Sequence, residues 1–182
     1  MNEFDLSTGL ILKAAAFAAE KHRDQRRKDP EASPYINHPI ALANLLAAQG
    51  VTRPEVLCAA LLHDTIEDTE TTPEELEAHF GAHIAAIVLE VTDDKNLPKA
   101  ERKQQQIDHA PHASIEAKLV KLADKICNLR DILHSPPAGW PLERQLEYFE
   151  WAAQVISGVR GAHVGLEAIF DDIYGRKGEL RA

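Results

Sequence analysis

The sequence has few cysteines and no long apolar run, and each shortage excludes a class of protein. Two cysteines, Cys58 and Cys127, occur among 182 residues. Both lie within apolar helical patterns, so we expect buried thiols in a reducing compartment, with the cytoplasm as the default location. No apolar run approaches the roughly 20 residues that a membrane span needs. The first residues also lack the basic and apolar regions of a signal peptide.

Positive charge is scarce as well, since the formal net charge is −9. This balance argues against nonspecific binding to nucleic acid or to an anionic membrane surface. It leaves room for a small anionic ligand, because a local basic pocket can oppose the overall sign of the charge. The length suits one domain with a well-formed core.

Alternating strand patterns are missing, and apolar residues recur at helical spacing along almost the whole chain. We therefore predict an all-α fold, a single helical bundle over residues 1–182 with no second domain. Proline near the start and glycine near the end mark several of the expected helices. The expected helices cover residues 6–25, 38–50, 52–68, 71–81, 82–94, 98–110, 114–133, 141–160 and 163–175.

A cluster of ionisable residues ends the apolar part of the expected helix 52–68. In "LLHDTIEDT", residues 61–69, His63 and Asp64 are followed one turn later by Glu67 and Asp68. Side chains three and four positions apart share a helix face, so we expect a compact patch of one imidazole and three carboxylates. A divalent cation would balance this charge, since histidine with carboxylate and open water positions suits a catalytic metal site.

Two donors from one helix are too few, so further ligands must come from elsewhere. His38 begins the expected helix 38–50, and Asp124 interrupts an apolar stripe in the helix 114–133. Each has a simpler interpretation. A lone histidine beside an aspartate is usually a hydrogen-bonded pair, and Asp124 could be paired with Lys121 or Lys125. The ordered combination favours a metal site.

The order His38, His63-Asp64, Asp124 resembles the metal-ligand pattern of the HD-type phosphohydrolases. Longer motifs narrow the likeness to the single-domain alarmone hydrolases of the RelA/SpoT family, and within them to the metazoan SpoT-homologue type. The resemblance extends over about residues 10–175. The motifs are "RRKDPEASPYINHPI", "ALLHDTIEDTETT", "EVTDDKNLPKAERK", "KLVKLADKICNLRDI" and "EYFEWAAQV".

This resemblance implies hydrolysis of guanosine 3′,5′-bis(diphosphate), ppGpp, to GDP and pyrophosphate, with Mn²⁺ as the cofactor. It implies no synthetase or regulatory domain. The implied catalytic pair is Glu67 and Asp68, with the division of labour between them left open. The implied metal ligands are His38, His63, Asp64 and Asp124.

The resemblance also implies a basic nucleotide pocket. Arg27 and Lys28 belong to the densest basic run, where a guanidinium can stack on a base and an ammonium can meet phosphate, although such a run is most often a solvated face. Asn128 lies four residues after Asp124 and could hydrogen-bond to base or ribose. The positions expected near the far phosphate are Lys99, Arg144 and Tyr148. Trp140 and Trp151 are expected to be packing residues.

Two other functions stay open. One is a phosphatase that removes the 2′-phosphate of NADPH, because both substrates carry phosphate on a ribose hydroxyl. The other is a nucleotide sensor without catalysis, which the loss of a ligand or of the Glu67-Asp68 pair would favour. Neither is lost. The sequence does not predict the oligomeric state.

Overall fold

Helices account for the regular structure of the described residues, 3–181, in this computed structural model, and the all-α prediction is confirmed. The β-type pairing found in the described part of the chain is one isolated antiparallel bridge between Arg26 and Pro34. The helices are α1 (Glu3–Lys21), α2 (Asn37–Ala48), α3 (Pro54–Leu62), α4 (Thr65–Asp68), α5 (Pro73–Phe80), α6 (Ala82–Val91), α7 (Lys99–His109), η1 (Ala110–His112), α8 (Ile115–His134), α9 (Leu142–Ser157), α10 (Val164–Gly175) and η2 (Arg176–Glu179).

The prediction of one continuous helix over residues 52–68 is wrong, because the segment forms two helices. α3 ends at Leu62, and the short helix α4 starts at Thr65. The Thr65 hydroxyl donates to the Leu62 carbonyl oxygen at 2.7 Å, which satisfies a backbone acceptor at the end of α3. His63 and Asp64 therefore lie in a turn between helices rather than on a continuous helix face.

The structure confirms that proline begins and glycine ends the helix expected within residues 71–81. The Thr72 hydroxyl accepts a hydrogen bond from the Glu75 backbone N–H at 3.2 Å, and Pro73 begins α5. Gly81 ends this helix with φ of +86°, a conformation that side chains with a Cβ rarely adopt. The Glu75 carboxylate meanwhile forms an ion pair with Lys21 of α1 at 2.8 Å.

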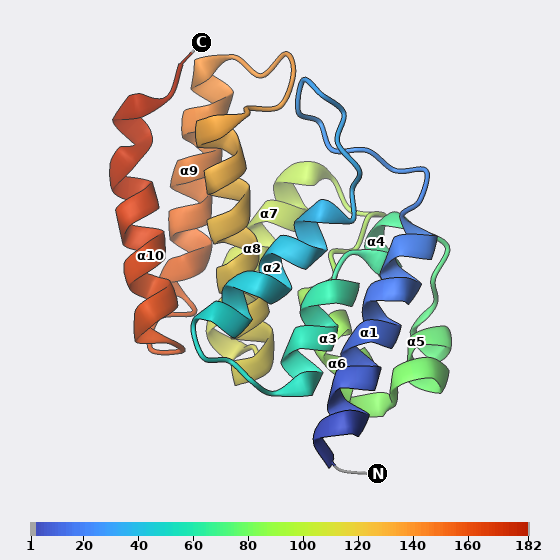
Figure 1. Cartoon of the computed structure of the whole chain (residues 1–182). Helices are drawn as coiled ribbons and strands as arrows, with labels where there is room; N and C mark the ends of the chain where they lie inside the picture. The colour runs from blue at the N-terminus through green and yellow to red at the C-terminus, as the bar shows by residue number, and fades with distance from the viewer. Residues whose placement is uncertain (1–2, 182) are drawn as a thin grey trace.

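α3 and α8 form the centre of the bundle. Every residue from 56 to 62 in α3 is buried, as expected of a helix that is apolar on all sides. α3 packs against α1, α2, α6 and α8, while α8 also packs against α9 and α10. Figure 1 shows α9 and α10 on one flank of α8 and α1 and α5 on the opposite side of the molecule. Burying one side chain such as Leu122 contributes about 1.5–3 kcal/mol.

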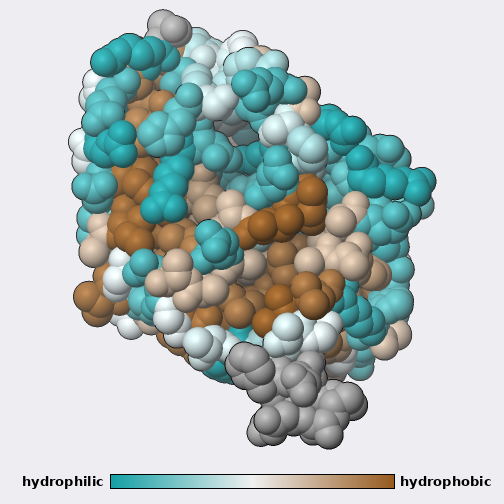
Figure 2. Space-filling model, in the orientation of Figure 1, coloured by the Kyte–Doolittle hydropathy of each residue, from teal (hydrophilic) through white to brown (hydrophobic). Residues whose placement is uncertain are grey.

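Two loops meet at one end of the bundle and leave polar surface there. The backbone N–H of Ala138, after α8, donates to the Lys28 carbonyl oxygen, after α1, at 2.7 Å. Figure 1 shows these two loops side by side, and Figure 2 shows that this end of the face is mostly hydrophilic, whereas apolar residues gather lower down. Among the described residues, no helix has the length and apolar content needed to cross a membrane.

Candidate active site

Three largely buried side chains from distant parts of the chain converge below these loops. His38 is in the first turn of α2, His63 follows α3, and Asp124 lies in the middle of α8. One ligand atom from each lies within 4.8 Å of the others. Two imidazoles and a carboxylate at this spacing could hold a divalent metal ion and leave coordination positions open.

The hydrogen bonding of His63 fits a metal ligand. Its Nδ1 lies 2.8 Å from the Ala60 carbonyl oxygen, to which it donates, so Nε2 is the atom that faces the cluster. Nε2 is buried and has no hydrogen-bond partner among the described residues, although Asp64 Oδ2 is 2.8 Å away. Burial lowers the pKa of His63, but Asp64 and Asp124 raise it to about 9. A bound cation would take the place of this proton.

Asp64 is adjacent to the cluster rather than part of it. The group whose ligand atoms lie within 4.8 Å of one another, searched among the described residues, contains His38, His63 and Asp124. Asp64 accepts a hydrogen bond from the Tyr35 hydroxyl at 2.5 Å. Its role as a fourth ligand therefore stays a prediction, which requires the carboxylate to reach the ion from its present position beside His63.

Asp124 is the most highly connected carboxylate of the site. It lies 3.2 Å from His38 Nε2, 2.9 Å from Lys125 Nζ and 2.6 Å from the amide nitrogen of Asn128. Burial alone would raise the pKa of Asp124, but Lys125 and His38 hold it well below its usual range. Of the two lysines that the sequence offered as partners, Lys125 is the one in contact.

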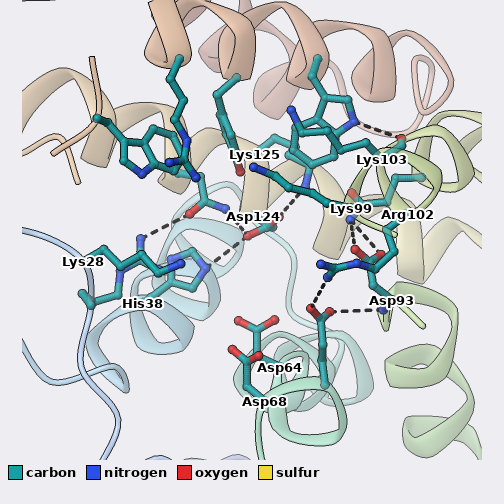
Figure 3. Close-up of a pocket in the computed structure, with 18 of the residues that line it drawn as sticks. Lys28, His38, Asp64, Asp68, Asp93, Lys99, Arg102, Lys103, Asp124 and Lys125 are labelled. Atoms are coloured by element: carbon teal, nitrogen blue, oxygen red, sulfur yellow. Dashed lines mark hydrogen bonds and ion pairs between the residues drawn. The ribbon is translucent and has the colours of Figure 1, made fainter. Parts of the chain in front are cut away.

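The neighbours Glu67 and Asp68 project into different surroundings. Glu67 accepts a hydrogen bond from the Asp93 backbone N–H at 3.2 Å and lies 3.8 Å from Arg102. Burial and the nearby Asp93 carboxylate raise the pKa of Glu67 to about 7. Asp68 instead accepts from the Gln25 amide at 3.0 Å and forms an ion pair with Lys95. Figure 3 shows Asp64 and Asp68 on one side of the pocket and Asp124 with Lys125 opposite.

A cavity of about 450 Å³ opens above these groups and is lined by both signs of charge. It contains Glu67, Asp68 and all six of the positions predicted to bind substrate. Those six are Arg27, Lys28, Lys99, Asn128, Arg144 and Tyr148. A second cavity of about 910 Å³ continues from it between the two loops and shares eight lining residues, including Arg27, His38 and Asn128.

The predicted binding residues have defined contacts. The Arg27 guanidinium lies 2.5 Å from Asp131 and 3.3 Å from Asn128, which fixes it at the mouth of the second cavity. Arg144 lies 4.2 Å from the centre of the Trp140 ring, a cation–π distance. Trp140 was expected to be a packing residue, and it does pack, but it also lines both cavities.

Sequence reasoning missed a cationic helix face. Lys99 was predicted, but Arg102, Lys103 and Gln106 line the same cavity from α7. Figure 3 shows Lys99, Arg102 and Lys103 directed toward the pocket. Their spacing of three and four residues was the available signal, because it places them on one side of a helix. Asp93, which Gln106 contacts at 2.8 Å, was missed because it lies in the loop before α7.

The fold and the cluster together define a class of protein. A family model described as HD domain matches residues 14–147. The chain therefore belongs to the HD-domain family.

Known relatives cover nearly the whole chain. It is 57% identical over 173 residues to the guanosine-3′,5′-bis(diphosphate) 3′-pyrophosphohydrolase MESH1 of Danio rerio, covering 94% of this chain and 96% of the relative. It is 57% identical over 169 residues to the human MESH1, and the match covers 92% of this chain and 94% of the relative. A solved structure described as a metazoan ortholog of SpoT that hydrolyses ppGpp matches with a TM-score of 0.90 and 46% identity, covering 94% and 97%. The resemblance to the metazoan type of RelA/SpoT hydrolase is confirmed.

Proposed function

We propose that this chain is a guanosine-3′,5′-bis(diphosphate) 3′-pyrophosphohydrolase, which hydrolyses ppGpp to GDP and pyrophosphate. One observation carries the proposal. The potential metal ligands His38, His63 and Asp124 converge beside the Glu67-Asp68 pair, at the base of a cavity lined by basic residues. The MESH1 relatives bear the name of this activity.

The proposed cofactor is Mn²⁺, held by His38, His63, Asp64 and Asp124. The donor set fits such an ion because the buried Nε2 of His63 faces the cluster and lies 2.8 Å from the carboxylate of Asp64, the fourth proposed ligand. When bound, a divalent ion supplies a Lewis-acid charge that favours ionisation of water and stabilises charge on a phosphoryl group. Lys125 would meanwhile keep Asp124 ionised and oriented.

Glu67 is the better candidate for proton transfer. A carboxyl group with a pKa of about 7 can accept a proton from an attacking water and release it again at neutral pH. One oxygen of Asp68 accepts a hydrogen bond from Gln25, and the other forms an ion pair with Lys95. Each carboxylate oxygen has a further lone pair, so Asp68 is suited to orienting a donor such as water.

The cavity residues divide into two groups that could hold the two ends of ppGpp. Arg27, Lys28 and Asn128 border the second cavity and would meet the nucleoside. Lys99 and Arg144, which line the first cavity alone, would meet phosphate together with Tyr148, which lines both cavities. A small anionic nucleotide is therefore the proposed partner, and neither nucleic acid nor a membrane is one. The single domain over residues 1–182 and the cytoplasmic location stay predictions.

A second candidate is the NADPH 2′-phosphatase, which gives NADH and phosphate. It is favoured by the second cavity, which continues from the first and offers space for a dinucleotide. The two functions differ in their products. We expect the Mn²⁺-loaded protein to release pyrophosphate from ppGpp. Orthophosphate released from NADPH at a comparable rate would favour the second candidate, and metal binding without turnover of either would favour a sensor.

Two substitutions separate metal binding from catalysis. We expect Asp64→Ala to abolish both turnover and metal retention, because it removes a proposed ligand. We expect Glu67→Ala to retain the metal while losing most activity. Metal content by atomic emission and pyrophosphate release measure the two properties independently. Normal turnover by the Glu67→Ala protein would show that its catalytic assignment is wrong.

A further inference from the structure

A buried histidine outside the metal cluster is connected to the acidic pair. His22, immediately after α1, is 1% exposed. Its Nδ1 lies 2.7 Å from the side-chain oxygen of Gln25, and the Gln25 amide nitrogen lies 3.0 Å from Asp68 Oδ2. The chain of contacts therefore runs from α1, through the loop, to the short helix α4. None of the proposed metal ligands takes part in it.

The direction of these hydrogen bonds follows from the chemistry of the groups. An amide nitrogen only donates, so Gln25 donates a hydrogen bond to the Asp68 carboxylate, and the Gln25 side-chain oxygen must be the acceptor from His22. His22 Nδ1 is then the donor, and its other ring nitrogen, which is buried, has no partner among the described residues. The remaining oxygen of Asp68 faces Lys95.

Further contacts hold the His22–Gln25–Asp68 chain of hydrogen bonds, here called the relay, in place. The His22 ring lies 4.8 Å from the Tyr35 ring at an angle of 34°. The Gln25 backbone contacts both neighbours, donating to the His22 carbonyl oxygen at 2.9 Å and accepting from the Tyr35 N–H at 3.1 Å. These bonds fix the Gln25 backbone, and the side-chain amide is bonded to His22 through its oxygen and to Asp68 through its nitrogen, so it can fix the direction of the Asp68 carboxylate.

We propose that Gln25, oriented by His22, is a positioning residue that aims the Asp68 carboxylate into the active-site cavity. The proposal rests on the proposed hydrolase function for its kinetic consequences. Gln25 also lines the second cavity, but its side-chain amide is bonded to Asp68, so we expect its loss to affect the reaction step more than the binding of substrate or metal. Glu67, whose partners are Asp93 and Arg102, is unaffected by the relay.

The test uses Gln25→Leu in the full-length, Mn²⁺-loaded protein. We expect kcat for ppGpp to fall about 10- to 100-fold, because a misplaced catalytic group costs this much. KM and Mn²⁺ affinity should stay close to the wild-type values. His22→Phe keeps a ring against Tyr35 and removes the Nδ1 donor, so we expect a smaller loss in kcat. Arg23→Ala, an exposed change in the same turn, is the matched control and should behave as wild type.

Two further measurements distinguish positioning from a general structural effect. Gln25→Glu can donate to Asp68 only when its new carboxyl group is protonated, so its activity relative to wild type should rise as the pH falls. A crystal structure of the Gln25→Leu protein should show Asp68 turned from its present direction. That observation tests the contact even if wild-type protein fails to hydrolyse ppGpp, a result that would refute the proposed function instead. Unchanged kcat, or an unmoved Asp68, would overturn the positioning role.

Discussion

At the scale of single residues, adjacent acids have unlike properties because their surroundings differ. Glu67 is largely buried next to Asp93, and its pKa rises from 4.5 to about 7. Asp68 is one residue away, but Gln25 and Lys95 contact its two oxygens. The sequence Glu-Asp predicts a catalytic pair through family resemblance, whereas the contacts show that the two side chains have different partners.

The raised pKa of Glu67 has a consequence for stability. The folded state binds this proton more tightly than the unfolded state, so stability falls as the pH rises from 4.5 toward 7. Glu67→Gln removes the charged form and should stabilise metal-free protein more at pH 8 than at pH 5, by about 2 kcal/mol. Urea unfolding of EDTA-treated protein at both pH values measures the difference.

The exposed Glu70 provides a control for this experiment. We expect the effect of Glu67→Gln on the free energy of unfolding to depend on pH more strongly than the effect of Glu70→Gln. An equal effect of Glu67→Gln at the two pH values would contradict the raised pKa.

At the scale of elements, α7 contributes charge to the cavity and packs against the core through the partly buried Ile107. None of its residues is buried. It is attached to α9 through Trp151, whose indole N–H donates to the Lys103 carbonyl oxygen at 3.1 Å. Lys103 and Lys125 also lie over the Trp151 ring, 5.0 and 4.4 Å from its centre. This contact helps to hold the cationic face of α7 over the active site.

Trp151→Phe should loosen α7. The substitution keeps a ring and removes the hydrogen bond to Lys103, which we expect to cost about 1 kcal/mol in the free energy of unfolding. Amide hydrogen exchange should quicken in residues 99–109 more than in α8, and KM for ppGpp should rise. Tyr174→Phe, which removes an exposed hydrogen bond to Glu150, is the control and should leave α7 unchanged. Uniform exchange across all helices would argue against a local effect.

At the scale of the whole molecule, the net charge is negative, whereas many of the side chains that line the cavity are basic. The protein carries −9 overall, yet Arg27, Lys28, Lys99, Arg102, Lys103, Lys125 and Arg144 line the cavity. Acidic side chains there offset part of this charge, and a bound divalent ion would add two positive charges. A nucleotide approaching the site therefore meets local attraction despite the repulsive sign of the molecule.

The salt dependence of kcat/KM should show whether the basic cavity or the negative net charge dominates the approach of the substrate. We expect kcat/KM for ppGpp to decrease on the order of tenfold between about 50 and 500 mM NaCl, because salt screens the attraction. Lys28→Ala should weaken this dependence. An increase of kcat/KM with salt would mean that the overall negative charge dominates the encounter.

The sequence by itself determined the helical class, most helix limits and the positions of the candidate ligands. Helix periodicity and caps such as Thr72 and Gly81 are local properties, readable from neighbouring residues. Only the tertiary structure decided that His38 and Asp124, 86 residues apart, come within 3.2 Å. It also decided that His63 and Asp64 lie in a turn and that α7 faces the cavity. The physical reason is that the packing of α2 and α3 on α8 fixes these distances, and the spacing of neighbouring residues in the sequence does not encode how helices pack.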